Sequence, residues 1–268
     1  MTGPRTSGAD PRRRRAWWIV ALLTGLAVAC CTGTFLVGRL AADHSSATRT
    51  ITRPVKLLRI DDTGGSVTVD AGPPGQVRLR EDLDWVLRKP KVEHRWDGDT
   101  LLVTVLCPDG SGPFHALGCR ADVRIEVPAD TAVQSVAAAG STTVSGISGA
   151  VDLSAGSGPV TLTAVVGPVT VSTASGPVQG DGLRSSRVQV QSTSGPITLN
   201  FAAAPAVATV GSTSGPIDIG VPRGPRYRAT ARSASGPASV GDGLDDPAAT
   251  SLLTATSASG PVDIDYLA

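Results

Sequence analysis

The stretch VQVQSTSGPITLNF, Val188–Phe201, contains a Ser-Gly-Pro tripeptide between two short segments in which apolar and polar residues alternate. Alternation with a period of two is typical of a half-buried β-strand. Glycine followed by proline marks a corner between the two strands. The same tripeptide recurs at 157–159, 175–177, 214–216, 235–237 and 259–261. A unit of strand, corner and strand is therefore repeated through the second half of the chain.

The spacing of the glycines predicts the architecture. Gly149, Gly158, Gly167 and Gly176 lie nine residues apart, and beyond Gly176 the interval widens to about 20 residues. A fixed period of this size is typical of a repeat architecture. We therefore expect an all-β fold, in which residues 131–268 form a β-solenoid of Ser-Gly-Pro β-strand repeats. An antiparallel β-sandwich of two-strand hairpins is the alternative.

The residue types explain the corners. Glycine permits the backbone angles of a sharp turn, and proline, which has no N–H, suits the first residue of a strand. In the last unit, Asp263, Asp265 and Tyr266 are expected to cap the open end of the solenoid, because an uncapped edge invites pairing between molecules. The expected structural corners are Gly158, Pro159, Gly176, Pro177, Gly195, Pro196, Gly215, Pro216, Gly236, Pro237, Gly260 and Pro261.

Residues 55–130 differ in composition from the repeats and are expected to form an N-terminal β subdomain. Their segments alternate apolar with charged residues, as Arg78 and Arg80 do beside Val77 and Leu79. This is again the period of half-buried strands. Residues 39–54 are polar with little periodicity and are expected to be a linker.

Cys107 and Cys119 enclose a turn-rich loop of this subdomain, and the remaining cysteines lie within residues 16–38. In an oxidising compartment, two cysteines close in sequence most often form a disulfide. The alternative is a metal site that adds His115 to both thiols, although the spacing matches no standard zinc motif.

The N-terminus predicts a membrane anchor. Residues 1–15 hold five arginines and one aspartate, and residues 16–38 are an uninterrupted apolar-to-neutral run. The run is long enough for a transmembrane helix, and the arginines should stay on the cytoplasmic side. We expect a single-pass plasma-membrane protein with a cytoplasmic basic tail and with the bulk of the chain extracytoplasmic. A signal peptide cleaved after Ala27-Val28-Ala29 and a lipidated Cys30 are the alternatives.

With these features the chain resembles the bacterial putative adhesin family in its actinobacterial, membrane-anchored form. Members of this family are extracytoplasmic β-strand-repeat domains of unknown function. The resemblance covers about residues 50–268 and rests on the repeated Ser-Gly-Pro-[Val/Ile]-x-[Leu/Ile] unit, on VRIEVPADT and on the two loop cysteines. Many members carry an acidic residue where this chain has proline after glycine. The resemblance implies surface attachment and transfers no catalytic residue.

Catalytic motifs are missing from the sequence. Residues 131–268 contain no His or Lys that could activate a serine or threonine, and neither a phosphate-binding loop nor a dinucleotide fingerprint occurs. Arg223, Arg226, Arg228 and Arg232 form a candidate anion-binding stripe, for which a solvated strand face is the plainer interpretation. Similarly, Asp242, Asp245 and Asp246 could hold Ca²⁺ but are more typical of turns.

These observations predict a non-enzymatic protein without metal or cofactor. Because the folded region is not basic, nucleic acid is not an expected partner. The leading hypothesis is an adhesin or envelope-binding scaffold, with a cell-wall polymer or another envelope protein as its partner. One alternative is a sensory or regulatory ectodomain that acts through another membrane protein. A carbohydrate-active β-helix enzyme, which would need converging carboxylates, is a further alternative.

Overall fold

The computed structural model describes residues 21–22, 24–25, 43–85, 89–107 and 119–267. Residues 21–22 and 24–25 are helical. In this described part of the chain, no helix combines the length and the apolar character that crossing a membrane requires. The expected basic tail, residues 1–15, and the remainder of the expected membrane helix, residues 16–38, lie outside the described residues.

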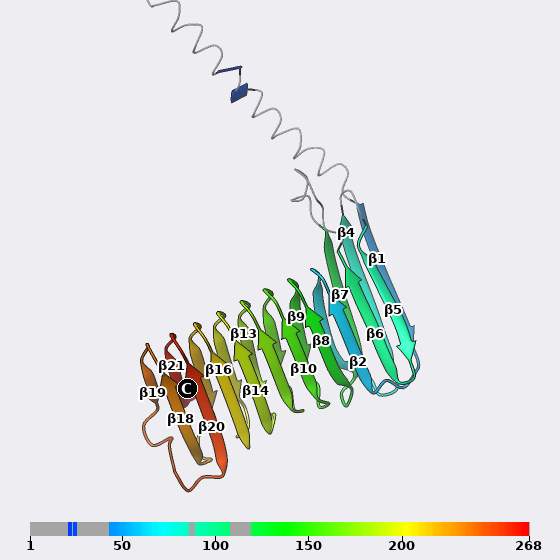
Figure 1. The fold of residues 1–268 in the computed structure, drawn as a ribbon. Helices are drawn as coiled ribbons and strands as arrows, with labels where there is room; N and C mark the ends of the chain where they lie inside the picture. Colours follow the sequence, from blue (N-terminus) through cyan, green and yellow to red (C-terminus); the bar gives the residue numbers. More distant parts are fainter. Residues whose placement is uncertain (1–20, 23, 26–42, 86–88, 108–118, 268) are drawn as a thin grey trace, which may run out of the picture. The chain divides into compact units, whose positions relative to one another are not determined.

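His44–Ala268 form one compact unit, in which two β-sheets are stacked face to face (Figure 1). In spatial order, the 11-stranded sheet consists of β1 (Asp43–Ile51), β4 (Val77–Trp85), β7 (Arg120–Pro128), β3 (Ser66–Gly72), β9 (Ser141–Ser145), β11 (Val160–Thr163), β13 (Val178–Leu183), β15 (Ile197–Phe201), β17 (Ile217–Val221), β21 (Val262–Tyr266) and β19 (Ala238–Val240). The 10-stranded sheet consists of β18 (Tyr227–Ser233), β20 (Ser251–Ser257), β16 (Val207–Ser212), β14 (Arg187–Ser192), β12 (Val169–Thr173), β10 (Val151–Ala155), β8 (Ala132–Ala137), β2 (Leu57–Asp62), β6 (Thr100–Leu106) and β5 (Lys91–Asp97).

The repeats stack as the parallel rungs of a β-solenoid. Each repeat contributes one strand to the 10-stranded sheet, turns at its Ser-Gly-Pro corner and contributes the next strand to the 11-stranded sheet. Val151, Val169, Val188 and Ala208 align in register, so one rung takes 18 to 20 residues. From β8 onward the described strands pair in parallel, which antiparallel hairpins cannot do, and the sandwich alternative is therefore wrong.

The nine-residue spacing of glycines marks both corners of a rung. Gly158 and Gly176 lie at the Ser-Gly-Pro corner, whereas Gly149 and Gly167 lie at the opposite corner. The next two opposite corners, residues 184–186 and 202–206, contain no glycine, and in the first of them Ser185 donates a hydrogen bond to the carbonyl oxygen of Val165 at 3.2 Å. The glycine spacing thus changes from nine to about 20 residues because one of the two corners changes, while the length of a rung stays at 18 to 20 residues.

Close approach between rungs explains why the corner residue is glycine. The Ser-Gly-Pro glycines do not adopt positive φ, so the expectation that they supply special turn angles is wrong. A Cβ atom on Gly176 would overlap the carbonyl oxygen of Gly158, and one on Gly195 would overlap that of Gly176. Glycine is needed because the neighbouring backbone occupies the place of a side chain.

A hydroxyl three residues before each of the later corner glycines caps the turn. These hydroxyl oxygens accept a hydrogen bond from the glycine N–H at 2.7–3.2 Å, and they belong to Thr173, Ser192, Ser212, Ser233 and Ser257. The serines of the tripeptides themselves, such as Ser194, are exposed. The structural hydroxyl is therefore the first residue of Ser-x-Ser-Gly-Pro.

The core lies between the sheets and consists mainly of valine, isoleucine and leucine. Inward positions such as Val69, Ile125 and Leu199 are fully buried, and so are Val262 and Ile264 of the last repeat. Phe201 and Tyr227 are the largest fully buried side chains. Trp85 of β4, Trp96 of β5 and Tyr266 of β21 are partly buried and pack against this core.

Two expectations about the organisation of the chain change. The expected linker, residues 39–54, contains β1, an edge strand that lies beside β4. The expected subdomains, 55–130 and 131–268, share both sheets, because β2 pairs with β8 and β3 pairs with β9. At this end β4 and β5 pair antiparallel with β7 and β6.

The last repeat does not cap the solenoid. β21 lies between β17 and β19, and β20 lies between β16 and β18. The preceding repeat, Tyr227–Val240, therefore forms the outermost rung (Figure 1). The predicted end cap at Asp263, Asp265 and Tyr266 is wrong, because the chain first extends to the end of the stack and then returns to fill the gap.

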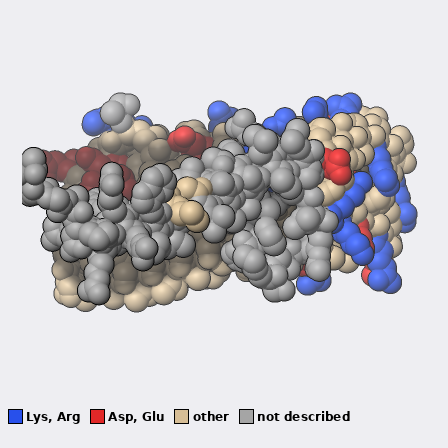
Figure 2. Space-filling view, turned by 90° about the horizontal axis from the view of Figure 1, so that it is seen from above, with Lys and Arg blue, Asp and Glu red and all other residues tan. Residues whose placement is uncertain are grey.

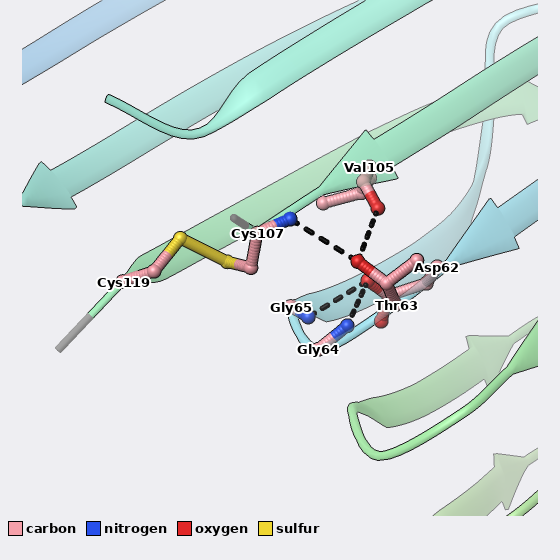
Figure 3. The surroundings of a disulfide bond; sticks show 7 residues. All are labelled: Asp62, Thr63, Gly64, Gly65, Val105, Cys107 and Cys119. Atoms are coloured by element: carbon pink, nitrogen blue, oxygen red, sulfur yellow. Dashed lines mark hydrogen bonds between the residues drawn. A yellow bond between two sulfur atoms is a disulfide. The ribbon is translucent and has the colours of Figure 1, made fainter. Parts of the chain in front are cut away.

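The predicted disulfide joins Cys107 and Cys119, whose Cα atoms are 5.7 Å apart (Figure 3). It closes the corner between β6 and β7, beside the turn that follows β2. The Cys107 N–H donates to Thr63 Oγ1 at 3.1 Å, and Asp62 Oδ1 accepts from the Gly65 N–H at 2.7 Å. The disulfide thus links the two ends of the loop between β6 and β7. Because both sulfur atoms are bonded to each other, the alternative metal site is not formed; its third member, His115, lies outside the described residues.

Candidate functional site

A continuous row of polar side chains crosses the outer face of the 11-stranded sheet. Alternate residues of a strand point to the same face, and the register places outward residues of neighbouring strands side by side. We name this set the polar row; from β4 to β19 it consists of Arg80, Arg124, Thr68, Thr143, Thr161, Gln179, Thr198, Asp218, Asp263 and Ser239. At an interstrand spacing of about 4.8 Å, the polar row is roughly 40 Å long.

The middle of the polar row is uncharged and available for binding. Thr143, Thr161, Gln179 and Thr198 occupy successive strands there. Among the described residues, their side chains have no hydrogen-bond partner. Threonine is restricted at χ1 by its branched Cβ, so these hydroxyl groups are held at regular intervals by a rigid sheet.

The two ends of the polar row differ in charge. Figure 2 shows Lys and Arg side chains gathered toward the end that holds β4–β7, whereas Asp and Glu side chains appear toward the end that holds β17–β21. At the first end, a groove of about 450 Å³ contains Arg80 and Arg124 and extends to Arg120. The polar row is therefore basic at one end, neutral in the middle and acidic at the other.

Carboxylates crowd the acidic end. Burial raises the pKa of Asp218, and the neighbouring carboxylates of Asp263 and Asp265 raise it further. Ser239 lies on the other side of Asp263 and shares a 2.6 Å hydrogen bond with its Oδ1 atom. Asp218 has no such hydrogen-bond partner among the described residues.

The predicted anion-binding stripe is dispersed. The Arg223 guanidinium lies 5.0 Å from the ring centroid of Tyr266, and Arg226 Nη1 lies 3.3 Å from Asp246 Oδ2. Arg228 Nη2 donates to the carbonyl oxygen of Ala249 at 3.2 Å. Of the four arginines, Arg228 and Arg232 share the outer face of β18. Arg226 and Arg228 thus contact the same turn, residues 246–249, whereas Arg223 lies against Tyr266.

Two of the three aspartates considered for Ca²⁺, Asp245 and Asp246, have structural partners. Asp245 Oδ1 accepts from the Ala229 N–H at 3.0 Å, and Asp246 Oδ1 accepts from the Ala248 N–H at 2.9 Å. The first bond attaches the turn after β19 to β18, and the second lies within that turn. In the part of the chain that the structure describes, no group of three or more His, Cys, Asp or Glu side chains is arranged to hold a metal ion.

Sequence reasoning missed the polar row. Each of its members is an ordinary outward residue of an alternating strand, and the strand register alone brings them into line. The predicted corners, by contrast, lie where the repeats place them, along one edge between the two sheets.

Comparisons with known proteins complete the description. No curated protein matches the sequence. Among solved structures, a "putative cell adhesion protein" from Clostridium sporogenes is 9% identical, with 84% of this chain and 100% of that one covered and a TM-score of 0.42. A "putative adhesin" from Bacteroides fragilis is 12% identical, with 83% and 97% covered and a TM-score of 0.36. A "putative lipid binding protein" from Parabacteroides distasonis is 12% identical, with 84% and 97% covered and a TM-score of 0.31.

A family model described as Toastrack DUF4097 matches residues 120–265, a range that runs from β7 into β21. The match includes more than half of the chain and every rung from β8/β9 onward. The chain belongs to the Toastrack DUF4097 family.

Proposed function

We propose that this protein is a non-catalytic binding scaffold of the cell envelope that holds an extended glycan along the neutral middle of its polar row. The observation that carries the proposal is the series Thr143, Thr161, Gln179 and Thr198, whose side chains are repeated at one strand spacing. Hydroxyl and amide groups pair with the repeated hydroxyl and amide groups of a glycan. The ligand is therefore expected to lie across the strands, parallel to the long axis of the solenoid.

Several weak contacts along one rigid surface can provide useful affinity. A preorganised surface avoids part of the entropy cost of ordering side chains on binding. Linked binding units then add avidity, since the second unit binds at a high effective concentration. The neutral middle of the polar row suits an uncharged or weakly charged glycan.

A non-catalytic role is supported by what surrounds the hydroxyls. The repeats contain no His or Lys that could act as a base toward a threonine. We include in the proposal that residues 16–38 anchor the protein in the plasma membrane, with the solenoid outside. The apolar run supports this anchor, and the Cys107–Cys119 disulfide supports an oxidising compartment.

The test compares hydroxyl deletions on the two sheets of the full-length protein. Thr161→Val with Thr198→Val removes two hydroxyls from the polar row and keeps β-branched side chains. Thr170→Val with Thr209→Val makes the same change on the exposed face of the 10-stranded sheet. Binding of purified cell-wall glycan, measured by calorimetry, should weaken about tenfold or more in the first double variant, which corresponds to about 1.4 kcal/mol. Equal affinity of the two double variants, or no glycan binding by the wild type, would contradict the proposal.

A further inference from the structure

The basic end of the polar row contains an arrangement of charges that the fold does not require. On the outer face of the antiparallel pair β4/β7, Arg78 faces Glu126 and Asp84 faces Arg120. Between these complementary pairs, Arg80 faces Arg124 and Asp82 faces Asp122. Like charges directly opposite one another destabilise a sheet. Two such pairs are adjacent here, and the repulsion within each pair destabilises the pairing of β4 with β7.

The arginines of this region are held by one edge of the guanidinium group. Arg80 Nε lies 2.9 Å from Asp82 Oδ2, and Arg120 Nε lies 2.9 Å from Asp122 Oδ2. Arg124 Nε lies 3.5 Å from Asp70 Oδ2. Among the described residues, the terminal Nη groups of these three arginines have no hydrogen-bond partner. The carboxylates therefore restrain each guanidinium while its two Nη groups stay available as donors.

These donors line the groove of about 450 Å³, together with Ser66 and Thr68. The lining contains three arginines and two aspartates, so its net charge is positive. Thr68 lies beside Arg124 across β3 and β7, and Ser66 lies beside Asp122. Cationic forks and hydroxyl groups thus open into one space on the outer face of the sheet.

We propose that this groove is a binding site for a tetrahedral oxyanion, the phosphate or sulfate group of a ligand. A carboxylate has two oxygens and is matched by a single guanidinium fork. The groove offers three forks and the Thr68 hydroxyl, since the Ser66 hydroxyl already shares a 2.7 Å hydrogen bond with Ser141, and this set suits a group with three or four acceptor oxygens. An anion between Arg80 and Arg124 also offsets the repulsion of that pair. This site is separate from the neutral glycan-binding stretch, and its proposal does not rest on that function.

The test measures binding of inorganic phosphate, inorganic sulfate and acetate to the full-length protein at constant ionic strength. Constant ionic strength is needed because the arginines are exposed and their attraction is screened by salt. Phosphate and sulfate should bind more tightly than acetate. Arg80→Gln with Arg124→Gln should weaken phosphate binding about tenfold or more, since bonds to charged donors contribute strongly.

The matched control is Arg78→Gln with Arg59→Gln, which removes the same net charge from exposed positions outside the groove. This variant should bind phosphate as the wild type does, and thermal unfolding should show both double variants folded. An equal loss of phosphate affinity in the two double variants would show that phosphate is attracted only by the general positive charge, and it would overturn the proposal. Acetate binding as tight as phosphate binding, or no phosphate binding by the wild type, would also overturn it. Thr161→Val with Thr198→Val should leave phosphate binding unchanged, which separates this proposal from the glycan proposal.

Discussion

Gly195 lies directly against Gly176 of the preceding rung, so that a Cβ atom on Gly195 would overlap the Gly176 carbonyl oxygen. The same relationship joins Gly176 to Gly158 and Gly215 to Gly195. The corner glycines therefore permit the rung separation of about 4.8 Å that paired strands require, and this separation sets the spacing of the polar row.

Gly195→Ala should force two rungs apart. Overpacking of a close-packed site typically costs 1–3 kcal/mol, and we expect a loss of about 3 kcal/mol in the free energy of unfolding, because the clash involves backbone atoms. Urea unfolding measures this loss. Gly64→Ala is the control, since a Cβ atom there would lie 3.8 Å from the Cys107 Cβ in ordinary contact. Similar stability of the two variants would show that the corner glycines do not limit the rung spacing.

Ser192 and Ser194 should differ although they occupy the same corner. Ser192 is buried, and its Oγ atom accepts from the Gly195 N–H at 2.9 Å, whereas Ser194 is exposed. Ser192→Ala leaves that buried N–H without a partner and should cost about 1–3 kcal/mol. Ser194→Ala should change the free energy of unfolding by less than about 0.5 kcal/mol. If chemical denaturation gave the reverse order, the capping role of Ser192 would be refuted.

Loss of the Cys107–Cys119 disulfide should destabilise the solenoid. The cysteines are 12 residues apart in sequence, and closure of such a loop restricts the unfolded chain by about 3 kcal/mol in the chain-entropy model. Cys107→Ser with Cys119→Ser should lower the free energy of unfolding by about this amount. Reductant should lower the stability of the wild type equally and leave the double variant unchanged. An effect of reductant on the double variant would contradict this assignment.

Asp218→Asn should stabilise the protein at neutral pH. Because the pKa of Asp218 is raised above 3.8 in the folded state, the folded state binds this proton more tightly than the unfolded state. Stability from this group is present below pH 3.8 and is lost as the pH rises through the folded-state pKa. The substitution should therefore raise Tm at pH 7, with a gain that shrinks below pH 3.8.

The control for this substitution is Asp152→Asn on β10, where Gln134 and Thr170 are the cross-strand neighbours. Asp152 thus has no carboxylate beside it in the register. The same pH-dependent gain in both variants would show that the cluster of Asp218, Asp263 and Asp265 has no special effect.

The repeats could be predicted from the sequence because their signals are local. Alternating segments and Ser-Gly-Pro corners indicate strands and turns within each unit, and Val262 and Ile264 are inward as expected. The reason for the glycines could not be predicted, because it depends on contact between rungs. β1 escaped prediction because Asp43–Ile51 is an edge strand that buries little and needs few apolar residues.

Pairing between strands far apart in the sequence explains the other features of the structure that the sequence did not predict. The sequence of Ser251–Tyr266 does not indicate that β20 and β21 lie between the two preceding rungs of the stack. Parallel pairing depends on which strand edges are unpaired when the repeat folds, and this is not encoded in the repeat itself. The polar row has the same origin. Thr68 and Thr143 are 75 residues apart in sequence and are brought together by the pairing of β3 with β9.

The central claim is that the outer face of the 11-stranded sheet binds the glycan. Threonine-methyl NMR of the full-length protein during titration with purified cell-wall glycan tests it most directly. The account predicts chemical-shift changes at Thr143, Thr161 and Thr198 and unchanged shifts at Thr170 and Thr209 on the other sheet. Changes confined to Thr170 and Thr209, or no change at any of these methyl groups, would contradict it.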